Sequence, residues 1–527
     1  MAGKRKRQEV NVSASSVKKV ATQPAVTKEK AESTNGKSNL KTTKAPSRST
    51  SSQSAAAATT QEAQSSISVQ IVTGSYERVL HGLAATIPGS LLSQNSQPRK
   101  DDQEDTPKAS FSDTFLFAAH TAAVRCLAVS PPTEADKRIL ATGGSDERIN
   151  LYSISTAPPQ TSLDNPSLPT LSRTAVAENS KNRSLGSLIH HDRAVTRLHF
   201  PAKGKLFSAA EDSTIAISRT RDWTVLSTIK APIPKVQGRP SGDTAGPGEV
   251  PAGVNDFAIH PSQKLMLSVG KGERCMRLWN LMTGKKAGVL NFDRVLLAQV
   301  GEGRFSSGEG RRVLWDAAGE NYVVGFERGA VLFGIDSEPK AVFKAPGRPT
   351  KWHQMRFVES VEGAGESGVL AVSTEDGRIL FFATEGPDAG EGNLPQCPCV
   401  AQLGGTEAGS SGRVKDFEVL ELPNSKGGAK TLLVVTGSSD GAVRLWMLQP
   451  SNLANEGAED GAEEAGGAAA LKQVGSLVGT QETGDRITCL GAFLLDGNAA
   501  SNAKDDAAVE VGAAEEEGEE ESSEGDE

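Results

Sequence analysis

The sequence contains few of the side chains on which enzymes and metal proteins depend. Its 527 residues include five cysteines, seven histidines and only 5% aromatic residues. A zinc site needs four ligands, and Cys397 and Cys399 have no second pair nearby, so no metal site is predicted. The shortage of aromatic rings argues against a surface on which nucleic-acid bases stack. No secretory leader and no run of about 18 apolar residues occurs, so we expect a soluble intracellular protein with reduced thiols.

A search for catalytic motifs also finds little. No Gly-x-Ser-x-Gly nucleophile elbow is present. Gly36-Lys37-Ser38 matches the end of a phosphate-binding loop, but Ala31 stands where the first glycine belongs. His190 and His191 are adjacent and would point to opposite faces of a strand. The sequence therefore predicts no enzyme, no cofactor and no small-molecule substrate.

The chain does contain a stretch, residues 253–290, that divides into short apolar runs separated by Gly, Pro, Ser and Asn. The runs are residues 254–259, 265–269, 276–279 and 286–290. Such runs indicate β-strands, and none keeps a helical period. The third run ends in Leu278-Trp279-Asn280, where WD repeats carry Trp-Asp. The stretch therefore resembles one blade of a WD40 β-propeller.

The two ends of the predicted folded region complete one blade between them. Residues 68–83 repeat the pattern of residues 138–152, which is strand, polar turn and strand, but no first strand precedes them. Residues 486–493 have the pattern of a first strand with nothing after it. With residues 114–117 as the outer strand, the two ends would close the ring and pair strands that otherwise leave exposed edges.

Six further blades can be placed between these ends. Their first strands begin at Val124, Ala194, Val254, Arg312, His353 and Val414. Once the apparent insertions are set aside, about 42 residues remain for each of seven blades, within the roughly 40–45 of a WD repeat. We predict an all-β fold, a seven-bladed WD40 β-propeller over residues 67–496, closed by its N- and C-terminal strands.

Aspartate, histidine and tryptophan recur at fixed places in these blades. Four aspartates lie in the turn before a third strand: Asp146, Asp212, Asp376 and Asp440. Two histidines precede a first strand, and two tryptophans lie in third strands: His120, His191, Trp279 and Trp446. In WD repeats such side chains form a buried hydrogen-bonded network, so a structural role is favoured over catalysis. Gly272 replaces the turn aspartate in the third blade, and the fourth blade lacks the motif.

The terminal segments differ from the rest in composition and charge. Residues 1–66 hold twelve Lys and Arg against four Asp and Glu, whereas residues 497–527 hold one Lys against twelve Asp and Glu. Both are predicted to be disordered tails. The cluster Lys4, Arg5, Lys6 and Arg7 predicts a nuclear import signal, with a solvated charge run as the alternative. Ser523, among acidic residues, is a candidate phosphorylation site.

Four stretches resemble one WD-repeat family in particular: GSYERVLHGL (74–83), SDERINLY (145–152), AAEDSTIAISRTRDWTVLSTIK (209–230) and VNDFAIHPS…LWNLMTGKKAGVL (254–290). This is the family of the p21-activated-kinase-interacting protein and its fungal large-subunit assembly counterparts. The resemblance implies a scaffold in the nucleus and nucleolus, needed for 60S ribosomal subunit assembly and pre-rRNA processing. Its partners would be pre-60S particle proteins, and the basic tail is expected to contact pre-rRNA. The alternative is binding and inhibition of a p21-activated kinase.

Overall fold

The computed structural model describes residues 66–92, 108–132, 137–158, 179, 181–234, 252–359, 368–384, 393–410, 412–423, 430–454 and 471–495. The predicted import signal Lys4–Arg7, the candidate site Ser523 and the two charged tails lie outside these residues. The first and last described strands are β1 (Ile67–Ser75) and β28 (Ile487–Leu494). The predicted boundaries near residues 66 and 497 remain predictions.

Seven antiparallel sheets of four strands make up the described fold. Six of them, blades 1 to 6, use consecutive strands, named from the innermost outward. Blade 1 is β4 (Val124–Val129), β5 (Lys137–Gly144), β6 (Ile149–Ser155) and β7 (Arg183–Leu188). Blade 2 is β8 (Val195–Ala202), β9 (Lys205–Ala210), β10 (Thr214–Arg219) and β11 (Val225–Lys230). Blade 3 is β12 (Val254–Ile259), β13 (Leu265–Gly270), β14 (Cys275–Asn280) and β15 (Lys285–Asn291).

The remaining blades include the one that joins the two ends of the chain. Blade 4 is β16 (Arg312–Trp315), β17 (Asn321–Gly325), β18 (Gly329–Gly334) and β19 (Pro339–Lys344). Blade 5 is β20 (Trp352–Val358), β21 (Val369–Thr374), β22 (Arg378–Ala383) and β23 (Cys399–Gly404). Blade 6 is β24 (Val414–Leu422), β25 (Thr431–Ser438), β26 (Ala442–Leu448) and β27 (Ser476–Glu482). Blade 7 is β28, β1, β2 (Val79–Ile87) and β3 (Ser110–Ala118).

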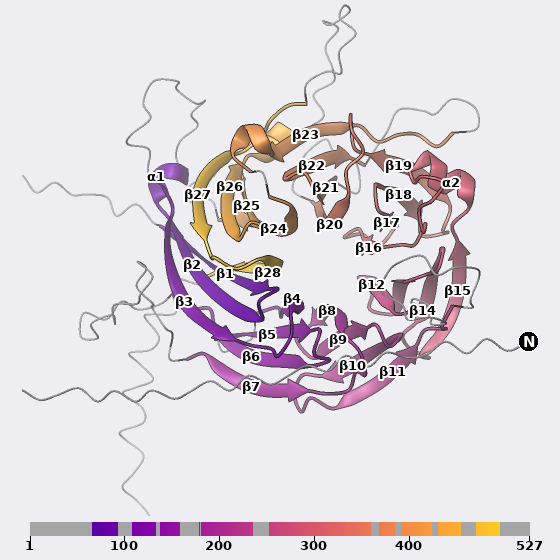
Figure 1. The fold of residues 1–527 in the computed structure, drawn as a ribbon, viewed down its shortest axis with the longest axis horizontal. Helices are drawn as coiled ribbons and strands as arrows, with labels where there is room; N and C mark the ends of the chain where they lie inside the picture. The colour runs from indigo at the N-terminus through magenta and orange to yellow at the C-terminus, as the bar shows by residue number, and fades with distance from the viewer. Residues whose placement is uncertain are drawn as a thin grey trace, which may run out of the picture. The chain divides into compact units, whose positions relative to one another are not determined.

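The innermost strands close a ring. Each contacts its neighbour in the order β4, β8, β12, β16, β20, β24 and β28, and β28 contacts β4 in turn (Figure 1). Closure depends on the antiparallel ladder in which Val69 to Ser75 of β1 pair with Leu494 to Ile487 of β28. The predicted seven-bladed, all-β propeller and its shared closing blade are therefore confirmed.

Second strands are buried on both faces because each lies inside its sheet and between two neighbouring blades. All five residues of β17 and all six of β21 are buried. A strand covered on both sides needs apolar residues throughout, so its sequence is a continuous run instead of an alternation. This explains why the short apolar runs located the strands well.

The outer edges of blades 4, 5 and 6 are covered by chain that leads into the outer strand of the next blade. Backbone N–H groups of this chain donate across the edge, in the pairs Cys397 to Val342, Val474 to Gln402 and Ala109 to Val478 (each 2.9 Å). The predicted insertions therefore carry some structure, because they cover edges that would otherwise remain unpaired.

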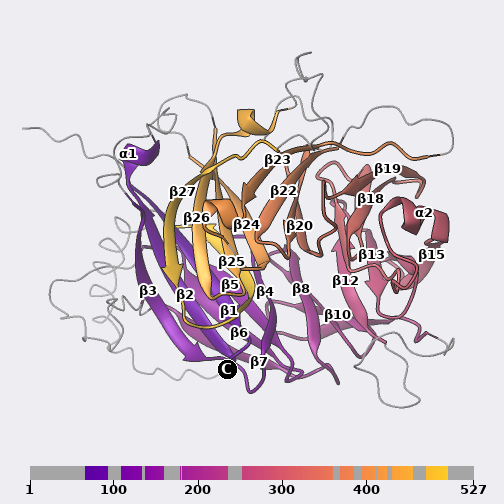
Figure 2. The ribbon, with the colours of Figure 1, turned by 45° about the horizontal axis from the view of Figure 1, so that its top comes forward.

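Short helices occupy parts of the connections. They are α1 (Gly89–Leu92), α2 (Arg294–Gln299), η1 (Thr406–Ala408) and η2 (Pro450–Leu453). Helix α2 lies between blades 3 and 4, near β19 (Figure 2). Asp293 caps it by accepting a hydrogen bond from the backbone N–H of Arg294.

Candidate functional site

The innermost strands begin with a β-bulge in six of the seven blades. A bulge leaves a residue out of the ladder, bends the strand and redirects a side chain. Strand β16 has no such bulge and simply opens with Arg312. We call the following side chains the rim residues: Arg125, Thr196, Asn255, Arg312, His353, Lys415 and Thr488.

Most rim residues bind the next blade around the ring. Four donate to a backbone carbonyl in the first strand of that blade or just before it: Thr488 to Val124 (2.6 Å), Thr196 to Val254 (2.7 Å), Asn255 to Gly310 (2.9 Å) and Arg312 to His353 (3.0 Å). Arg125 donates to the Glu211 carboxylate of blade 2 at 3.2 Å. Lys415 differs, since its Nζ lies 3.5 Å from Nε2 of His353 in the preceding blade. Five rim residues therefore bond to the following blade, whereas the contact of Lys415 is with the preceding one.

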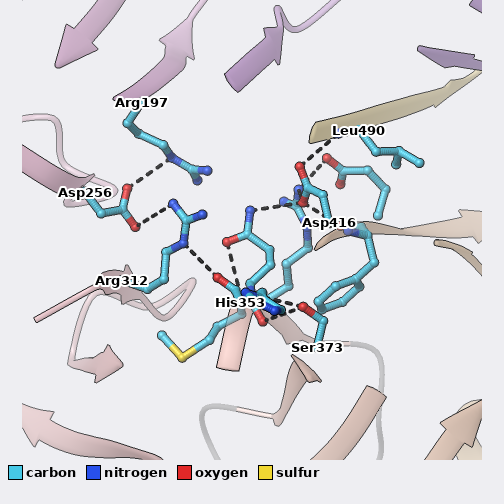
Figure 3. Close-up of polar contacts among 12 residues, drawn as sticks. Arg197, Asp256, Arg312, His353, Ser373, Asp416 and Leu490 are labelled. Atoms are coloured by element: carbon cyan, nitrogen blue, oxygen red, sulfur yellow. Dashed lines mark hydrogen bonds and ion pairs between the residues drawn. The ribbon is translucent and has the colours of Figure 1, made fainter. Parts of the chain in front are cut away.

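Two buried aspartates form a second set of links, one residue further along the innermost strands (Figure 3). Oδ1 of Asp256 accepts the N–H of Phe257, and Oδ2 accepts that of Val313 in blade 4. Asp416 repeats this arrangement in blade 6. Its Oδ1 accepts from Phe417 and its Oδ2 from Leu490 in blade 7.

Each of these aspartates also interacts with the preceding blade. Arg197 Nε of blade 2 lies 3.1 Å from Asp256 Oδ1, and Gln354 of blade 5 donates to Asp416 Oδ1 at 3.1 Å. A single carboxylate thus joins three consecutive blades. Asp256 and Asp416 are only 2% and 8% exposed, so the bonds they accept have little competition from water.

Positive and negative charges at the centre of the ring are paired. Three arginines and three carboxylates lie on the innermost strands: Arg197, Arg312, Arg356, Asp256, Asp416 and Glu418. Arg356 donates to Glu418 Oε1 at 2.5 Å and to the Phe417 carbonyl at 2.6 Å. Burial raises the pKa of Glu418 to about 7, although Arg356 opposes the shift. The arrangement joins neighbouring innermost strands of the ring.

The structure brings together the predicted aspartate–histidine groups of blades 1 and 2. His120 Nδ1 lies 2.9 Å from Asp146 Oδ1, and its Nε2 lies 2.9 Å from the Thr142 hydroxyl. His191 lies 3.0 Å from Asp212 and 2.8 Å from the Ser208 hydroxyl. These contacts tie the chain before the first strand to the second strand and to the turn that follows it.

The other predicted network residues have different partners. Asp376 pairs with Arg378, and Asp440 pairs with Arg444 and accepts the N–H of Ala442. Neither contacts a histidine in the described part of the chain. An arginine of the third strand therefore occupies the role that the sequence pattern assigns to a histidine.

Trp279 and Trp446 occupy matching places in third strands but bond differently. The Trp279 indole N–H donates to the Ser268 hydroxyl at 2.8 Å. The expectation that Trp446 closes such a network is wrong, because its N–H has no acceptor among the described residues. The hydroxyl of Thr436, which stands where blade 3 has Ser268, donates instead to the Arg444 carbonyl.

Cysteines, metal ligands and membrane spans add no further site within the described residues. Burial is the main cause of the raised pKa of Cys126 and of Cys397, each to about 12, so neither thiol is activated. No group of three His, Cys, Asp or Glu side chains in the described ranges is placed to hold a metal ion. No described helix is long and apolar enough to cross a membrane.

Comparison with known proteins agrees with this architecture. The family model of the WD domain, G-beta repeat, matches residues 111–153 and 182–217. The chain is a WD-repeat protein. Each matched segment begins with the outer strand of one blade and continues with three strands of the next. This offset between repeat and blade explains why one blade must be completed from both ends of the chain.

Several relatives of this WD-repeat protein match over most of its length. The p21-activated protein kinase-interacting protein 1-like of Xenopus laevis is 25% identical over 430 residues, which cover 82% of this chain and 83% of the relative. Protein MAK11 of Saccharomyces cerevisiae is 28% identical over 409 residues, which cover 72% and 78%. Shk1 kinase-binding protein 15 of Schizosaccharomyces pombe is 22% identical over 318 residues, which cover 60% and 69%.

Sequence reasoning missed the aspartate links and one buried pair. Blades 3 and 6 share the pattern Val-x-Asp-Phe, in residues 254–257 and 414–417. This repeated pattern could have indicated that the two aspartates have the same role. His81 of β2 and Asp113 of β3 form a buried contact at 2.9 Å in blade 7. They are 32 residues apart, so no local pattern indicated their pairing.

We expect Asp212→Ala to destabilise this WD-repeat protein more than Asp440→Ala. Asp212 accepts bonds from His191, from Thr214 and from the backbone N–H of Asp192, and its side chain is 9% exposed, against 30% for Asp440. Stranded buried donors cost roughly 1–3 kcal/mol, so we expect about 2–3 kcal/mol for Asp212→Ala and about 1 for Asp440→Ala. Denaturant unfolding measures both, and equal losses would contradict the network role of Asp212.

The pH dependence of the Asp212 variant provides a second measurement. Burial alone would raise the pKa of Asp212, but the hydrogen bonds from His191 and Thr214 outweigh it and lower the pKa from 3.8 to about 2. A depressed carboxyl pKa contributes stability above the ordinary pKa and loses it as pH falls toward the folded value. The difference between wild type and Asp212→Asn should therefore shrink between about pH 4 and pH 2.

Proposed function

We propose that this WD-repeat protein is a nucleolar scaffold that binds proteins of the pre-60S particle and is required for 60S subunit assembly and pre-rRNA processing. The support for the scaffold part is the bonding at the centre of the ring. The polar side chains there, such as Asp256 and Asp416, form hydrogen bonds between blades. No catalytic family is among the matches, and the matching WD repeats typically serve as binding platforms.

The large-subunit part of the proposal has separate support. The stretches within residues 74–290 that resemble this WD-repeat family imply the role of its fungal large-subunit assembly counterparts. The basic N-terminal segment, with twelve Lys and Arg against four Asp and Glu, would attract pre-rRNA phosphates, and this attraction should weaken as salt rises. The cluster Lys4–Arg7 would supply nuclear import.

Depletion of the protein is expected to lower the level of free 60S subunits and to leave that of 40S subunits largely unchanged. A scaffold acts stoichiometrically within one particle, so its loss should impair that particle alone. Sucrose-gradient profiles of depleted cells measure the ratio. Replacing Lys4, Arg5, Lys6 and Arg7 by alanine should move the protein partly to the cytoplasm and give a milder form of the defect. A normal 60S to 40S ratio after depletion would remove this proposal.

A second candidate function is binding and inhibition of a p21-activated kinase. The relatives from Xenopus laevis and Schizosaccharomyces pombe carry kinase-interacting or kinase-binding in their names. If this function applies, the purified protein should bind a p21-activated kinase and lower its activity. The subunit profile of depleted cells should then remain normal, so the two experiments separate the candidates.

A further inference from the structure

Lys415 departs from the pattern of the other rim residues. The five rim residues Arg125, Thr196, Asn255, Arg312 and Thr488 bond to the following blade, but Lys415 has no such bond in the described part of the chain. Its Nζ lies 3.5 Å from His353 Nε2, a long contact for a hydrogen bond. An ammonium group can donate three hydrogen bonds, so most of its capacity is unused. The one long contact with blade 5 therefore does not account for this lysine.

The surroundings of Lys415 are positively charged. Burial, followed by the charges of Arg413 and Arg486, lowers the pKa of Lys415, and only Glu375 opposes them. Glu375 itself pairs with Arg413 at 3.0 Å. Arg486 lies over the Tyr76 ring and forms no ion pair with a described carboxylate. The group thus has surplus positive charge, which costs free energy in the unbound protein.

His353 adds a neutral ring to this group. Burial and, to a smaller extent, the charges of Lys415 and Arg312 together lower the pKa of His353 to about 3. The ring is therefore neutral at physiological pH, and its Nε2 lies on the side of the Lys415 ammonium. Both side chains are only partly buried, so a group from outside can reach them.

Lys351 shows what an ordinary lysine does at this part of the ring. It directly precedes β20, and its Nζ pairs with Glu327 at 2.9 Å. Glu327 also pairs with Arg311. The charge of Lys351 is therefore compensated within the protein, and that of Lys415 is not.

We propose that Lys415 and His353, with Arg413 and Arg486 nearby, bind a carboxylate of an acidic peptide segment of a partner protein. A carboxylate would accept from the Lys415 ammonium and would neutralise the surplus charge. The proposal rests on the scaffold part of the proposed function and is independent of the large-subunit part.

An acidic peptide fits this part of the ring better than a nucleic-acid backbone does. The carboxylates of Glu327 and Glu375 stand among the cations, and Glu77 accepts from the backbone N–H of Arg486. A strand with a phosphate on every nucleotide would bring negative charges against these glutamates. A single acidic side chain, flanked by neutral residues, can reach Lys415 without this repulsion.

The test uses the full-length protein and three fluorescent probes: a peptide with a single glutamate flanked by Gly and Ser, its glutamine counterpart, and a short single-stranded RNA. Anisotropy titrations compare wild type with Lys415→Met and with the control Lys351→Met. We expect Lys415→Met to weaken binding of the glutamate peptide about tenfold and Lys351→Met to change it little. Binding to the wild type should weaken with salt, and the glutamine peptide should bind poorly.

Thermal unfolding distinguishes a binding residue from a structural one. Removing a partly buried, uncompensated charge should leave the midpoint of Lys415→Met unchanged or higher, whereas Lys351→Met loses an ion pair. Equal loss of peptide affinity in both variants would show general electrostatic attraction and would overturn the proposal. RNA binding that depends on Lys415, without peptide binding, would also overturn it. Because only the purified protein is used, failure here leaves the subunit-profile test of the large-subunit role unaffected.

Discussion

Replacing residues 67–83 by a Gly and Ser sequence of equal length is expected to abolish cooperative unfolding. The replacement removes β1 and the start of β2, so β28 loses its partner within blade 7 and the ring opens. The unpaired edges of β28 and β3 would then be available for aggregation. Circular dichroism during heating measures the transition.

The expected size of this effect follows from the packing of β1. On one side Val69 and Ile71 pack with Leu433 and Val435 of blade 6, and on the other Val72 packs with Leu140 of blade 1. Each fully buried side chain of this size contributes about 1.5–3 kcal/mol. Together with Leu80 and Leu83, which are also 0% exposed, the loss would approach or exceed the roughly 5–15 kcal/mol that stabilises a domain.

A matched control separates closure from the effect of a long substitution. Replacing residues 455–470, which lie between η2 and β27, by a Gly and Ser sequence of equal length leaves every strand of the ring in place. Long connections between strands generally tolerate such changes well, so the melting curve of this variant should resemble that of the wild type. If the replacement of residues 67–83 melted with an unchanged cooperative transition, the closing role of β1 would be excluded.

The strands were predictable because the signals that define them are local. Residues 254–259 form β12 as expected, and residues 68–83 and 486–493 supply β1, β2 and β28 of one blade. A strand covered by two neighbouring blades needs an apolar run, and the chain must turn after each run. Both requirements are visible within a few residues.

The links between blades were less predictable, because each depends on two residues far apart in the sequence. Asp416 contacts Leu490, and Thr488 contacts Val124. Helix α2 was missed for a different reason. Its residues, Arg294–Gln299, lie in a segment between blades 3 and 4 that was predicted to be an insertion. Asp293 before this run was a usable sign of a helix start.

Asp416→Ala is expected to cause the largest loss of stability among the single substitutions considered. Asp416 accepts bonds from Phe417, Leu490 and Gln354, and so joins blades 5, 6 and 7. Alanine would leave the N–H of Leu490 without an acceptor in the protein interior. Hydrogen bonds to a charged group are worth about 1.5–3 kcal/mol, and removing one partner of a buried ionic arrangement costs about 3–5 kcal/mol, so we expect a loss of about 3–5 kcal/mol.

Asp416→Asn distinguishes the hydrogen bonds from the packing of the side chain, because asparagine has nearly the same shape. One amide oxygen can still accept from Phe417 and Gln354, but the amide –NH₂ then faces the N–H of Leu490, where two donors repel. We therefore expect Asn to recover only part of the loss. Full recovery would show that the shape of the side chain matters and that the bond to blade 7 does not.

Asp256 and Asp376 test whether position on the innermost strand sets the size of the effect. Asp256 makes the equivalent contacts in blade 3, to Phe257 and to Val313 of blade 4, so Asp256→Ala should cost nearly as much as Asp416→Ala. The side chain of Asp376 is 40% exposed and bonds within its own turn, so Asp376→Ala should cost less than about 1 kcal/mol. The two inner aspartates are in separate blades and share none of these hydrogen-bond partners, so the losses of the double variant should nearly add. Denaturant unfolding of the four variants measures these values, and a loss for Asp376→Ala equal to that of Asp416→Ala would show that the carboxylates on the innermost strands have no special part in holding the ring together.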